Sequence, residues 1–280
     1  MSSPAAPTPH SAVREVAAGA RAGTTLVALD FDGVLAPLVD DPATSRALPE
    51  AARALERLAG AGVHVALVSG RALEDLWTVA APPPGVHLVG GHGAEQGRAT
   101  AEGLVRDPLD LPPRRARVLA ELRTALEDLA EGTTARVEHK PASVVLHTRT
   151  AAPDDARRLT EAAVTLGREA AVDVLAGKDV VELSVLDVSK GEALRALRAR
   201  LGVDRVFYAG DDVTDERAFA ALEPQDVTVK VGPGATAARH RLADPAAVAV
   251  LLDDLATLVA SAPPPAHAAP PVEPTAAAGS

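Results

Sequence analysis

The segment Thr24–Gly33 reads TTLVALDFDG and joins an apolar run to two aspartates and a glycine. A short, nearly continuous apolar run is typical of a strand that is buried on both faces of a parallel sheet. Ligands of open parallel sheets bind at the carboxyl ends of the strands. The segment therefore predicts a parallel sheet and places Asp30 and Asp32 at its functional edge.

Similar strands recur along the chain and alternate with helical segments. The predicted strands are Thr24–Phe31, Val63–Ser69, Val86–Gly90, Val203–Ala209 and Val227–Val231. Between the first two, Pro49–Ala61 carries apolar residues at helical spacing and ends among glycines. This alternation indicates an α/β fold in which helices cover both faces of a parallel sheet.

The middle of the chain has a different pattern. Its predicted elements are a helix over Pro112–Ala130, strands over Thr133–Lys140 and Ala142–Arg149, a helix over Pro153–Ala171, and strands over Val172–Ala176 and Lys178–Leu186. Residues alternate with a period of two along the strand after Pro141, as in a hairpin strand with one covered face. We predict a smaller α/β domain, residues 107–187, inserted into a core of residues 23–106 and 188–261.

Both ends of the chain are rich in Ala, Pro and small polar residues. Such segments bury too little apolar area to offset the conformational entropy that ordering removes. We therefore expect residues 1–22 and 262–280 to be disordered.

The composition excludes several classes of function. The 280 residues include no cysteine, which excludes a disulfide framework and any thiolate nucleophile or metal site. The formal charge of -10 argues against broad nucleic-acid binding, which needs a concentrated basic surface. No apolar run approaches the roughly 20 residues of a membrane span, and no secretion signal is recognisable. We expect a cytoplasmic protein, because the absence of cysteine fits a reducing compartment. We also expect a monomer that acts on a small molecule.

Polar residues that can act together follow three predicted strands and open one helix. They are Asp30-Phe31-Asp32-Gly33, Ser69-Gly70-Arg71, the GDDVTDE run from Gly210 to Glu216, and Ser189-Lys190-Gly191. Each alone has an ordinary explanation, as a turn, a strand-end glycine or an acidic helix start. None of these explains why two carboxylate clusters, a hydroxyl and a lysine meet at one sheet edge. Their convergence indicates a catalytic site.

The two aspartates after the first strand suit the hydrolysis of a phosphate monoester. A phosphate dianion repels nucleophiles until its charge is neutralised, and Mg²⁺ bound by carboxylates does this. Asp30 is the predicted nucleophile, forming an aspartyl-phosphate that water then cleaves. Asp32 is the predicted general acid for the leaving oxygen and the general base for the water.

The remaining polar residues supply the metal site and the phosphate site. Asp211 would complete the Mg²⁺ ligands, with Asp212 or Asp215 supporting it from behind. Lys190 and the Ser69 hydroxyl would bind the transferring phosphoryl group.

In order and separation these segments resemble the haloacid-dehalogenase-like phosphatases, and within them the trehalose-6-phosphate phosphatase family. The resemblance covers about Thr24–Leu258. Its further motifs are Gly91-His92-Gly93-Ala94-Glu95, Glu138-x-Lys140-x-x-Ser143-x-x-x-His147-x-Arg149, and Gly177-Lys178-x-Val180-x-Glu182. The core motifs are typical of the superfamily, whereas the motifs of the insertion point to trehalose 6-phosphate.

The resemblance implies a Rossmann-like core and a cap that closes over the sugar. It implies that Asp30, the Asp32 carbonyl and Asp211 bind Mg²⁺, and that Gly70 joins Ser69 at the phosphate. The residues expected at the substrate are Arg71, His92, Glu138, Lys140, Lys178 and Glu182. Strand periodicity agrees for the cap residues, because residues two apart share a face. Without the resemblance, the cap charges read as surface salt bridges, and His92 as a brace for its loop.

The sequence departs from the family in two places. Val34 stands where the family usually has Thr, and Ser184-Val185-Leu186-Asp187 stands where related sequences often carry Arg-Pro. Neither change removes a predicted nucleophile, metal ligand or phosphate lysine, so activity is expected with altered efficiency.

Two alternatives stay open. The first is a phosphatase of the same fold for another sugar phosphate, such as sucrose 6-phosphate or mannosyl-3-phosphoglycerate. The second is a catalytically silent regulatory module of a sugar-phosphate synthase. For the trehalose reading, the expected functional partner is a trehalose-6-phosphate synthase.

Overall fold

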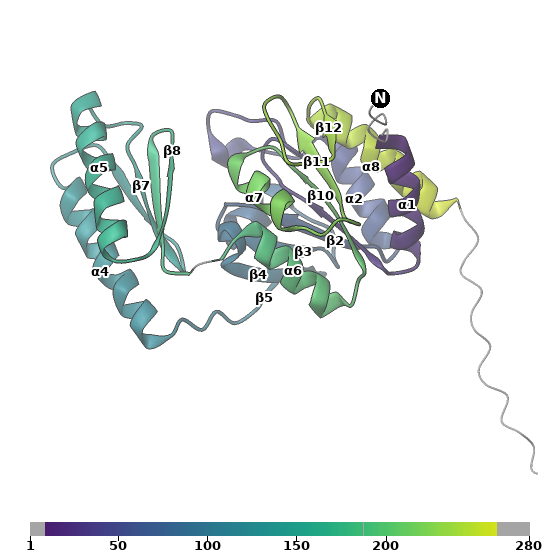
Figure 1. The fold of residues 1–280 in the computed structure, drawn as a ribbon, viewed down its shortest axis with the longest axis horizontal. Helices are drawn as coiled ribbons and strands as arrows, with labels where there is room; N and C mark the ends of the chain where they lie inside the picture. Colours follow the sequence, from purple (N-terminus) through teal and green to yellow (C-terminus); the bar gives the residue numbers. More distant parts are fainter. Residues whose placement is uncertain (1–8, 187, 262–280) are drawn as a thin grey trace, which may run out of the picture.

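The computed structural model describes residues 9–186 and 188–261 of the chain. Two units lie side by side (Figure 1). The larger contains an eight-stranded sheet and the smaller a four-stranded sheet. The larger sheet is mostly parallel and the smaller is antiparallel. The predicted α/β class, a parallel core sheet with a smaller inserted unit, is confirmed.

Strand β1 lies inside the large sheet, whose order is β12-β11-β10-β1-β2-β3-β4-β5. The strands are β1 (Thr25–Leu29), β2 (His64–Val68), β3 (His87–Gly90), β4 (Glu95–Thr100), β5 (Gly103–Arg106), β10 (Arg205–Gly210), β11 (Val227–Val231) and β12 (His240–Leu242). Every residue of β1 is buried, as its continuous apolar sequence predicts. Because β2 and β10 pair with it in parallel, the three carboxyl ends meet at one edge.

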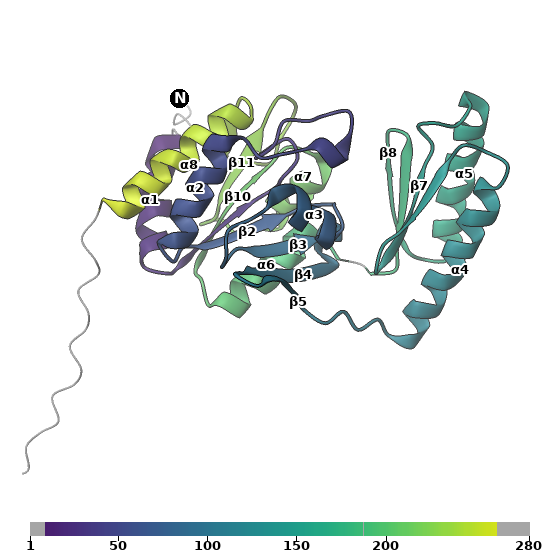
Figure 2. The ribbon, with the colours of Figure 1, turned by 180° about the vertical axis from the view of Figure 1, so that it is seen from behind.

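Helices cover both faces of this sheet (Figure 2). Alternate residues of β1 separate into two cores: Val27 and Leu29 face one side, and Leu26 and Ala28 face the other. The first core takes α1 (Pro9–Arg21), α2 (Pro49–Gly60), α3 (Leu73–Ala80) and α8 (Pro245–Ala260). The second takes α6 (Lys190–Leu201) and α7 (Val213–Ala221). The sheet thereby fixes the starts of α6 and α7 near the ends of its strands.

The expectation of a disordered N-terminus is wrong for residues 9–21, which form α1. Val13, Val16, Ala17 and Ala20 are buried against the core. Their helical spacing puts these apolar side chains on one face, and burying that face offsets the entropy of ordering. Residues 1–8 and the predicted disordered tail, residues 262–280, lie outside the described residues.

The inserted unit is a sheet with helices on one face only. Its elements are α4 (Pro113–Ala130), β6 (Arg136–His139), β7 (Ser143–His147), α5 (Pro153–Glu169), β8 (Asp173–Gly177) and β9 (Val180–Ser184). Val144, Leu146, Val181 and Leu183 pack against α4 and α5. Because side chains alternate along a strand, the residues between them face the larger unit. The uncovered face of this sheet is therefore available to a ligand.

Among the described helices, none combines the length and the apolar composition that crossing a bilayer requires.

Candidate active site

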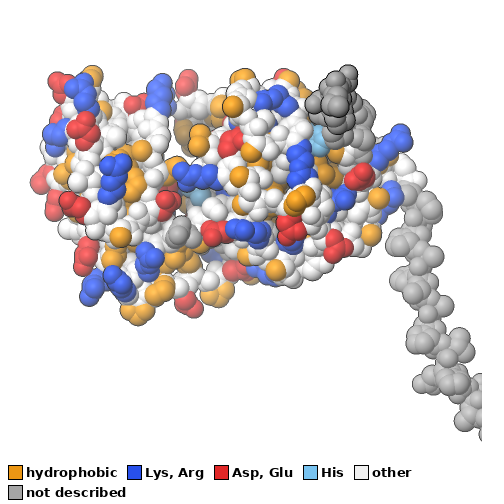
Figure 3. All heavy atoms as spheres, in the orientation of Figure 1, with side chains coloured by type: hydrophobic (Ala, Val, Ile, Leu, Met, Phe, Trp, Pro, Cys, Tyr) orange, Lys and Arg blue, Asp and Glu red, His pale blue; other side chains and the backbone are white. Residues whose placement is uncertain are grey.

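A cleft of about 860 Å³ lies where the two units meet, and the surface is hollowed there (Figure 3). It is bounded by the carboxyl ends of β1, β2 and β10 on one side and by the open face of the inserted sheet on the other. The predicted residues that line it are Asp30, Asp32, Ser69, Gly70, Arg71, His92, Glu138, Lys140, Glu182, Lys190, Asp211 and Asp212. Residues far apart in sequence thus form one site.

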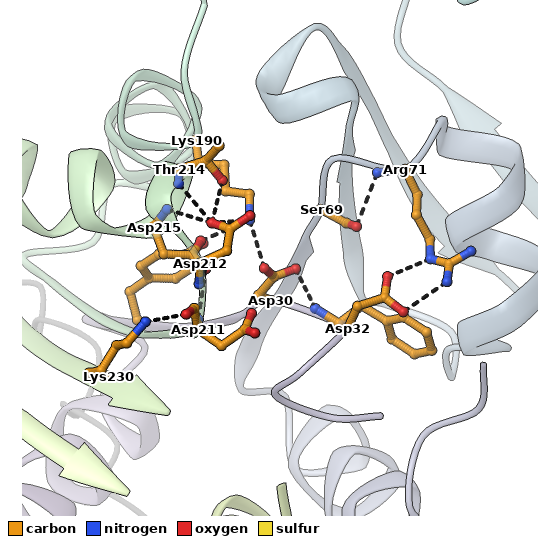
Figure 4. Close-up of polar contacts among 12 residues, drawn as sticks. Asp30, Asp32, Ser69, Arg71, Lys190, Asp211, Asp212, Thr214, Asp215 and Lys230 are labelled. Atoms are coloured by element: carbon orange, nitrogen blue, oxygen red, sulfur yellow. Dashed lines mark hydrogen bonds and ion pairs between the residues drawn. The ribbon is translucent and has the colours of Figure 1, made fainter. Parts of the chain in front are cut away.

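Asp30 and Lys190 form a buried ion pair at the base of the cleft (Figure 4). Asp30 follows β1, and its Oδ1 accepts a hydrogen bond from the Phe31 amide at 2.6 Å. Its Oδ2 accepts one from Lys190 Nζ at 2.7 Å. Lys190 is the first residue of α6, whose start is fixed by a capping box between Ser189 and Glu192. The lysine therefore approaches Asp30 from a rigid helix end.

Burial and charge act against each other in this pair. Burial raises the pKa of Asp30 well above its usual range, and the Lys190 ammonium opposes that rise. Burial alone would lower the pKa of Lys190, but Asp30 and Asp215 raise it. Lys190 consequently stays charged, and it stabilises the ionised form of Asp30 that a nucleophile needs.

Asp215 supports the site and has no oxygen left for a ligand. Its Oδ1 accepts hydrogen bonds from Lys190 Nζ at 2.8 Å and from the Tyr208 hydroxyl at 2.6 Å. Its Oδ2 accepts them from the Asp211 and Asp212 amides at 2.8 and 3.0 Å. Both oxygens are therefore occupied, and the buried carboxylate holds Lys190 and the turn after β10 in place.

Asp212 caps α7. Its Oδ1 accepts hydrogen bonds from the Thr214 amide and hydroxyl and from the Asp215 amide. Although burial would raise the pKa of Asp212, Lys190 and these donors hold it at about 2. The side chain is a negatively charged helix cap beside the cleft.

Asp211 differs from its neighbours, because its carboxylate accepts no hydrogen bond from the described residues. It lies against the turn after β1: a Cβ at Gly33 would come within 2.1 Å of Asp211 Oδ2. Gly33 also has a φ of +74°, so only glycine suits both demands. Burial, together with the charges of Asp215 and Asp212, raises the pKa of Asp211 to about 7.

These aspartates fit a divalent cation. Asp30, Asp212 and Asp215 each place a carboxylate oxygen within 4.8 Å of the others. Asp215 is saturated by hydrogen bonds and Asp212 serves as a helix cap, whereas the carboxylate of Asp211, which is not part of this group, accepts no hydrogen bond from the described residues. Burial and the charges of Asp215 and Asp212 raise the pKa of Asp211 more than Lys190 and Lys230 lower it. An all-oxygen set with surplus negative charge suits Mg²⁺.

Asp32 points away from Lys190 and is held by Arg71. The guanidinium donates to Asp32 Oδ2 at 2.6 Å and to Oδ1 at 2.8 Å. Oδ1 also accepts from the Ser45 hydroxyl at 2.9 Å. Arg71 donates further to the Pro42 carbonyl and lies over the Phe31 ring. In this arrangement both oxygens of the predicted acid and base are engaged.

Ser69 and Gly70, which follow β2, also line the cleft. The Ser69 hydroxyl accepts a hydrogen bond from the Arg71 amide at 3.2 Å. A Cβ at Gly70 would come within 2.4 Å of the His92 ring, so the close approach of His92 requires glycine there. His92 has a φ of +56°, a left-handed conformation that turns its ring into the cleft.

The inserted unit contributes a charged cluster on its open face. Glu182 accepts hydrogen bonds from Lys140 Nζ at 3.1 Å and from the Ser143 hydroxyl at 2.6 Å. Lys140 Nζ also donates to the Gly70 carbonyl at 3.1 Å, which links the two units. His92 lies 3.9 Å from Glu182, and burial lowers the pKa of this histidine.

Glu138 forms a second cluster beside the first. Its Oε2 accepts hydrogen bonds from His147 Nε2 at 2.8 Å and from Arg136 at 3.2 Å. The His147 hydrogen bond outweighs burial and, with the nearby Lys140 charge, lowers the pKa of Glu138 to about 2. The carboxylate is therefore charged at neutral pH.

Some predicted features lie elsewhere. Lys178 lies in the exposed turn between β8 and β9, outside the described lining of this cleft. Val34 is buried in the core, so the missing hydroxyl leaves no gap in the cleft wall. Ser184 closes its own loop by donating to the Leu186 carbonyl at 2.9 Å. Asp187 lies outside the described residues.

Three residues of the site are absent from the sequence prediction: Ser45, Tyr208 and Lys230. Each is buried, and each contacts a predicted aspartate. Tyr208 and Lys230 lie on β10 and β11, whose carboxyl ends are at the site. Tyr208 is two residues before the end of its strand, and Lys230 is one residue before the end. A polar side chain in that position of an apolar strand is the signal that could have identified them.

The sequence of the chain matches a known protein family. The family model described as Trehalose-phosphatase matches residues 28–246. A Trehalose-phosphate phosphatase of Mycobacterium avium (strain 104) is 37% identical over 245 residues, which are 82% of this chain and 61% of that protein. The chain thus spans about three fifths of the length of this curated relative.

Solved structures share the fold. The crystal structure of a trehalose-6-phosphate phosphatase related protein has a TM-score of 0.67 at 26% identity and covers 83% of this chain and 97% of its own. The C-terminal domain of Candida albicans trehalose-6-phosphate phosphatase has a TM-score of 0.70 at 24% identity. The match covers 91% of this chain and 100% of that domain.

The Glu138–His147 contact predicts a pH dependence. The folded-state pKa of Glu138, about 2, lies below the ordinary value of 4.5. The contact therefore stabilises the inserted unit above pH 4.5 and loses this effect as the pH falls toward 2. We expect His147→Phe to raise the pKa of Glu138 toward 4.5, because the donor that favours the carboxylate is lost.

Carbon-detected NMR titration of the Glu138 carboxyl, assigned with Glu138→Gln, measures this shift. His139→Phe is the matched control, since His139 pairs with Glu127 instead. An unchanged Glu138 pKa in His147→Phe contradicts the assignment of the shift to this hydrogen bond.

Proposed function

Because the chain belongs to the trehalose-phosphatase family, we propose that it hydrolyses trehalose 6-phosphate to trehalose and phosphate. The main support is the cleft itself, in which the buried Asp30–Lys190 pair faces the Glu182–Lys140 pair of the inserted unit. One wall suits a phosphoryl group, and the other suits a sugar rich in hydroxyls. A sugar phosphate fits both walls at once.

In the first step, an Asp30 oxygen attacks phosphorus. The new bond is an acyl phosphate, and the bond between phosphorus and the sugar oxygen breaks. Asp32 gives its proton to the departing sugar oxygen, which leaves as a hydroxyl. In the second step Asp32 takes a proton from water as the water attacks phosphorus. Phosphate leaves, and Asp30 is regenerated as a carboxylate.

Lys190, the Ser69 hydroxyl and the Gly70 backbone bind the phosphoryl oxygens during both steps. Asp30, the Asp32 carbonyl and Asp211 are the proposed ligands of Mg²⁺, with Asp212 and Asp215 behind them. When bound, Mg²⁺ neutralises charge on the phosphoryl group and so favours attack by a carboxylate. Lys190 alone is already engaged by Asp30 and Asp215, which is why a further positive charge is needed.

Arg71 has a proposed part in binding the substrate. Its fork now engages both oxygens of Asp32, yet a guanidinium also pairs well with a phosphate ester. Arrival of the dianion offers Arg71 an alternative partner and frees Asp32 for proton transfer. Substrate binding and release of the acid are thereby linked.

The inserted unit is the proposed cap, residues 107–187, between core segments 23–106 and 188–261. Glu138, Lys140 and Glu182 present acceptors and donors to glucose hydroxyls, which both donate and accept. His92 adds a ring at the same place. Lys178 lies on the exposed β8–β9 turn and would reach the sugar by closure of the cap.

Two alternatives are weaker. A phosphatase for sucrose 6-phosphate or mannosyl-3-phosphoglycerate would share the core but need other cap contacts. A silent regulatory module would not need Asp30, Asp32, Lys190 and Asp211, all of which line the cleft. We further propose a cytoplasmic monomer whose substrate comes from a trehalose-6-phosphate synthase.

Asp30→Asn tests the nucleophile. The amide still accepts a hydrogen bond from Lys190 but cannot attack phosphorus, so we expect kcat to fall at least about 1000-fold. Phosphate release measures activity, and circular dichroism checks the fold. Activity near the wild-type level in a folded variant would remove Asp30 from this role.

Glu182→Ala tests the sugar contact. Loss of a charged hydrogen-bonding group should raise KM for trehalose 6-phosphate about tenfold or more, with little change for an aryl phosphate that lacks the sugar. Glu127→Ala, at an exposed glutamate of the same unit, is the control and should leave both values unchanged. Equal increases of KM for both substrates would mean that Glu182 does not select the sugar.

A further inference from the structure

Lys230 is a second buried lysine beside the aspartates. It lies at the carboxyl end of β11 and is only 6% exposed. Its Nζ donates a hydrogen bond to the backbone carbonyl of Asp211 (Figure 4). It does not line the cleft among the described residues, so the reaction steps above make no use of it.

Both backbone polar atoms of Asp211 are held by buried side chains. Its amide donates to Asp215 Oδ2 at 2.8 Å, and its carbonyl accepts from Lys230. Its own carboxylate, by contrast, accepts no hydrogen bond from the described residues. Asp211 is therefore held through hydrogen bonds of its backbone, and its carboxylate is in close contact only with the turn at Gly33 among the contacts described above.

Lys230 also connects this turn to its surroundings. Its Nζ lies 3.8 Å from Glu216 Oε1, in the first turns of α7. Glu216 Oε2 in turn accepts a hydrogen bond from the Ala237 amide at 2.8 Å. One ammonium thus joins the end of β11, the turn after β10 and the start of α7.

A buried ammonium costs folding free energy unless it is well paired. Lys190, at the start of α6, already pairs with the carboxylates of Asp30 and Asp215. Lys230 is therefore not needed to balance the charge of these two residues. Its contact with a carbonyl fixes geometry at Asp211. We propose that Lys230 is a positioning residue that holds the Asp211 carboxylate toward Asp30, ready to bind Mg²⁺. This inference rests on the magnesium site of the proposed function.

Charge and position make opposite predictions for removal of Lys230. At a pH well above the raised pKa of Asp211, where that carboxylate is ionised with or without Lys230, a lysine that acted only as a nearby positive charge would repel the cation, so its loss would strengthen Mg²⁺ binding. A lysine that positions a ligand strengthens binding, so its loss weakens it, typically by roughly 10–100-fold for an outer support of a metal site. The direction of the change therefore distinguishes the two roles.

Isothermal titration of the full chain with MgCl₂ at that pH, without substrate, measures this change directly. We expect Lys230→Met to raise the Kd at least about tenfold and Lys230→Arg, which keeps a charged donor, to restore part of the affinity. Thr228→Val is the matched control, because Thr228 is buried on the same face of β11 but bonds the Arg239 amide instead. It should leave the Kd within about twofold of the wild type, as expected for a site without shared partners.

Three outcomes would overturn the inference about Lys230. A Kd that is unchanged or lower in Lys230→Met overturns the inference while leaving the proposed function intact. A Kd raised equally in Thr228→Val also overturns it, since general loosening of β11 would then suffice. A wild-type chain that does not bind Mg²⁺ overturns the metal site together with this inference. If Lys230→Met does not fold, Lys230→Gln is judged by the same criterion.

Discussion

The structure depends on one buried contact, the ammonium of Lys190 between the carboxylates of Asp30 and Asp215. A lysine and two aspartates out of water are costly unless they satisfy one another. Their pairing fixes the end of β1, the turn after β10 and the start of α6 in one geometry. Without it, Asp30 and Asp215 would be buried carboxylates with no ammonium between them.

Two surfaces, one from the core and one from the inserted unit, form the cleft. The core supplies residues from strand ends and helix starts, which a parallel sheet brings to one edge. The inserted sheet supplies its uncovered face, where Glu138, Lys140 and Glu182 alternate with residues that pack on α4 and α5. In the proposed function, the first surface carries out the chemistry and the second selects the molecule that carries the phosphate. Lys140, which reaches the Gly70 carbonyl, joins them.

The position of several predicted site residues follows from the local sequence pattern. Apolar strands that end in carboxylates predict that Asp30 and Asp211 lie at one sheet edge, and both line the cleft, because the strand ends of a parallel sheet converge. Sequence reasoning failed at α1, whose Ala-rich composition suggested disorder although its apolar face is buried. It also missed Ser45 and Lys230, single polar residues whose partners lie far away in sequence. The hydrogen bonds from Arg71 to Asp32 could not be predicted either, because the two residues are 39 positions apart and no sequence pattern indicates their contact.

The proposed function is tested most simply by measuring phosphate release from trehalose 6-phosphate, sucrose 6-phosphate, glucose 6-phosphate and an aryl phosphate, with Mg²⁺ and again with a chelator. The proposed function predicts a strong preference for trehalose 6-phosphate that the chelator abolishes. Preference for another sugar phosphate would keep the core chemistry and contradict the assignment of the cap. Absence of phosphate release from all four, with Mg²⁺ present, would contradict the central claim that this cleft is a phosphatase site.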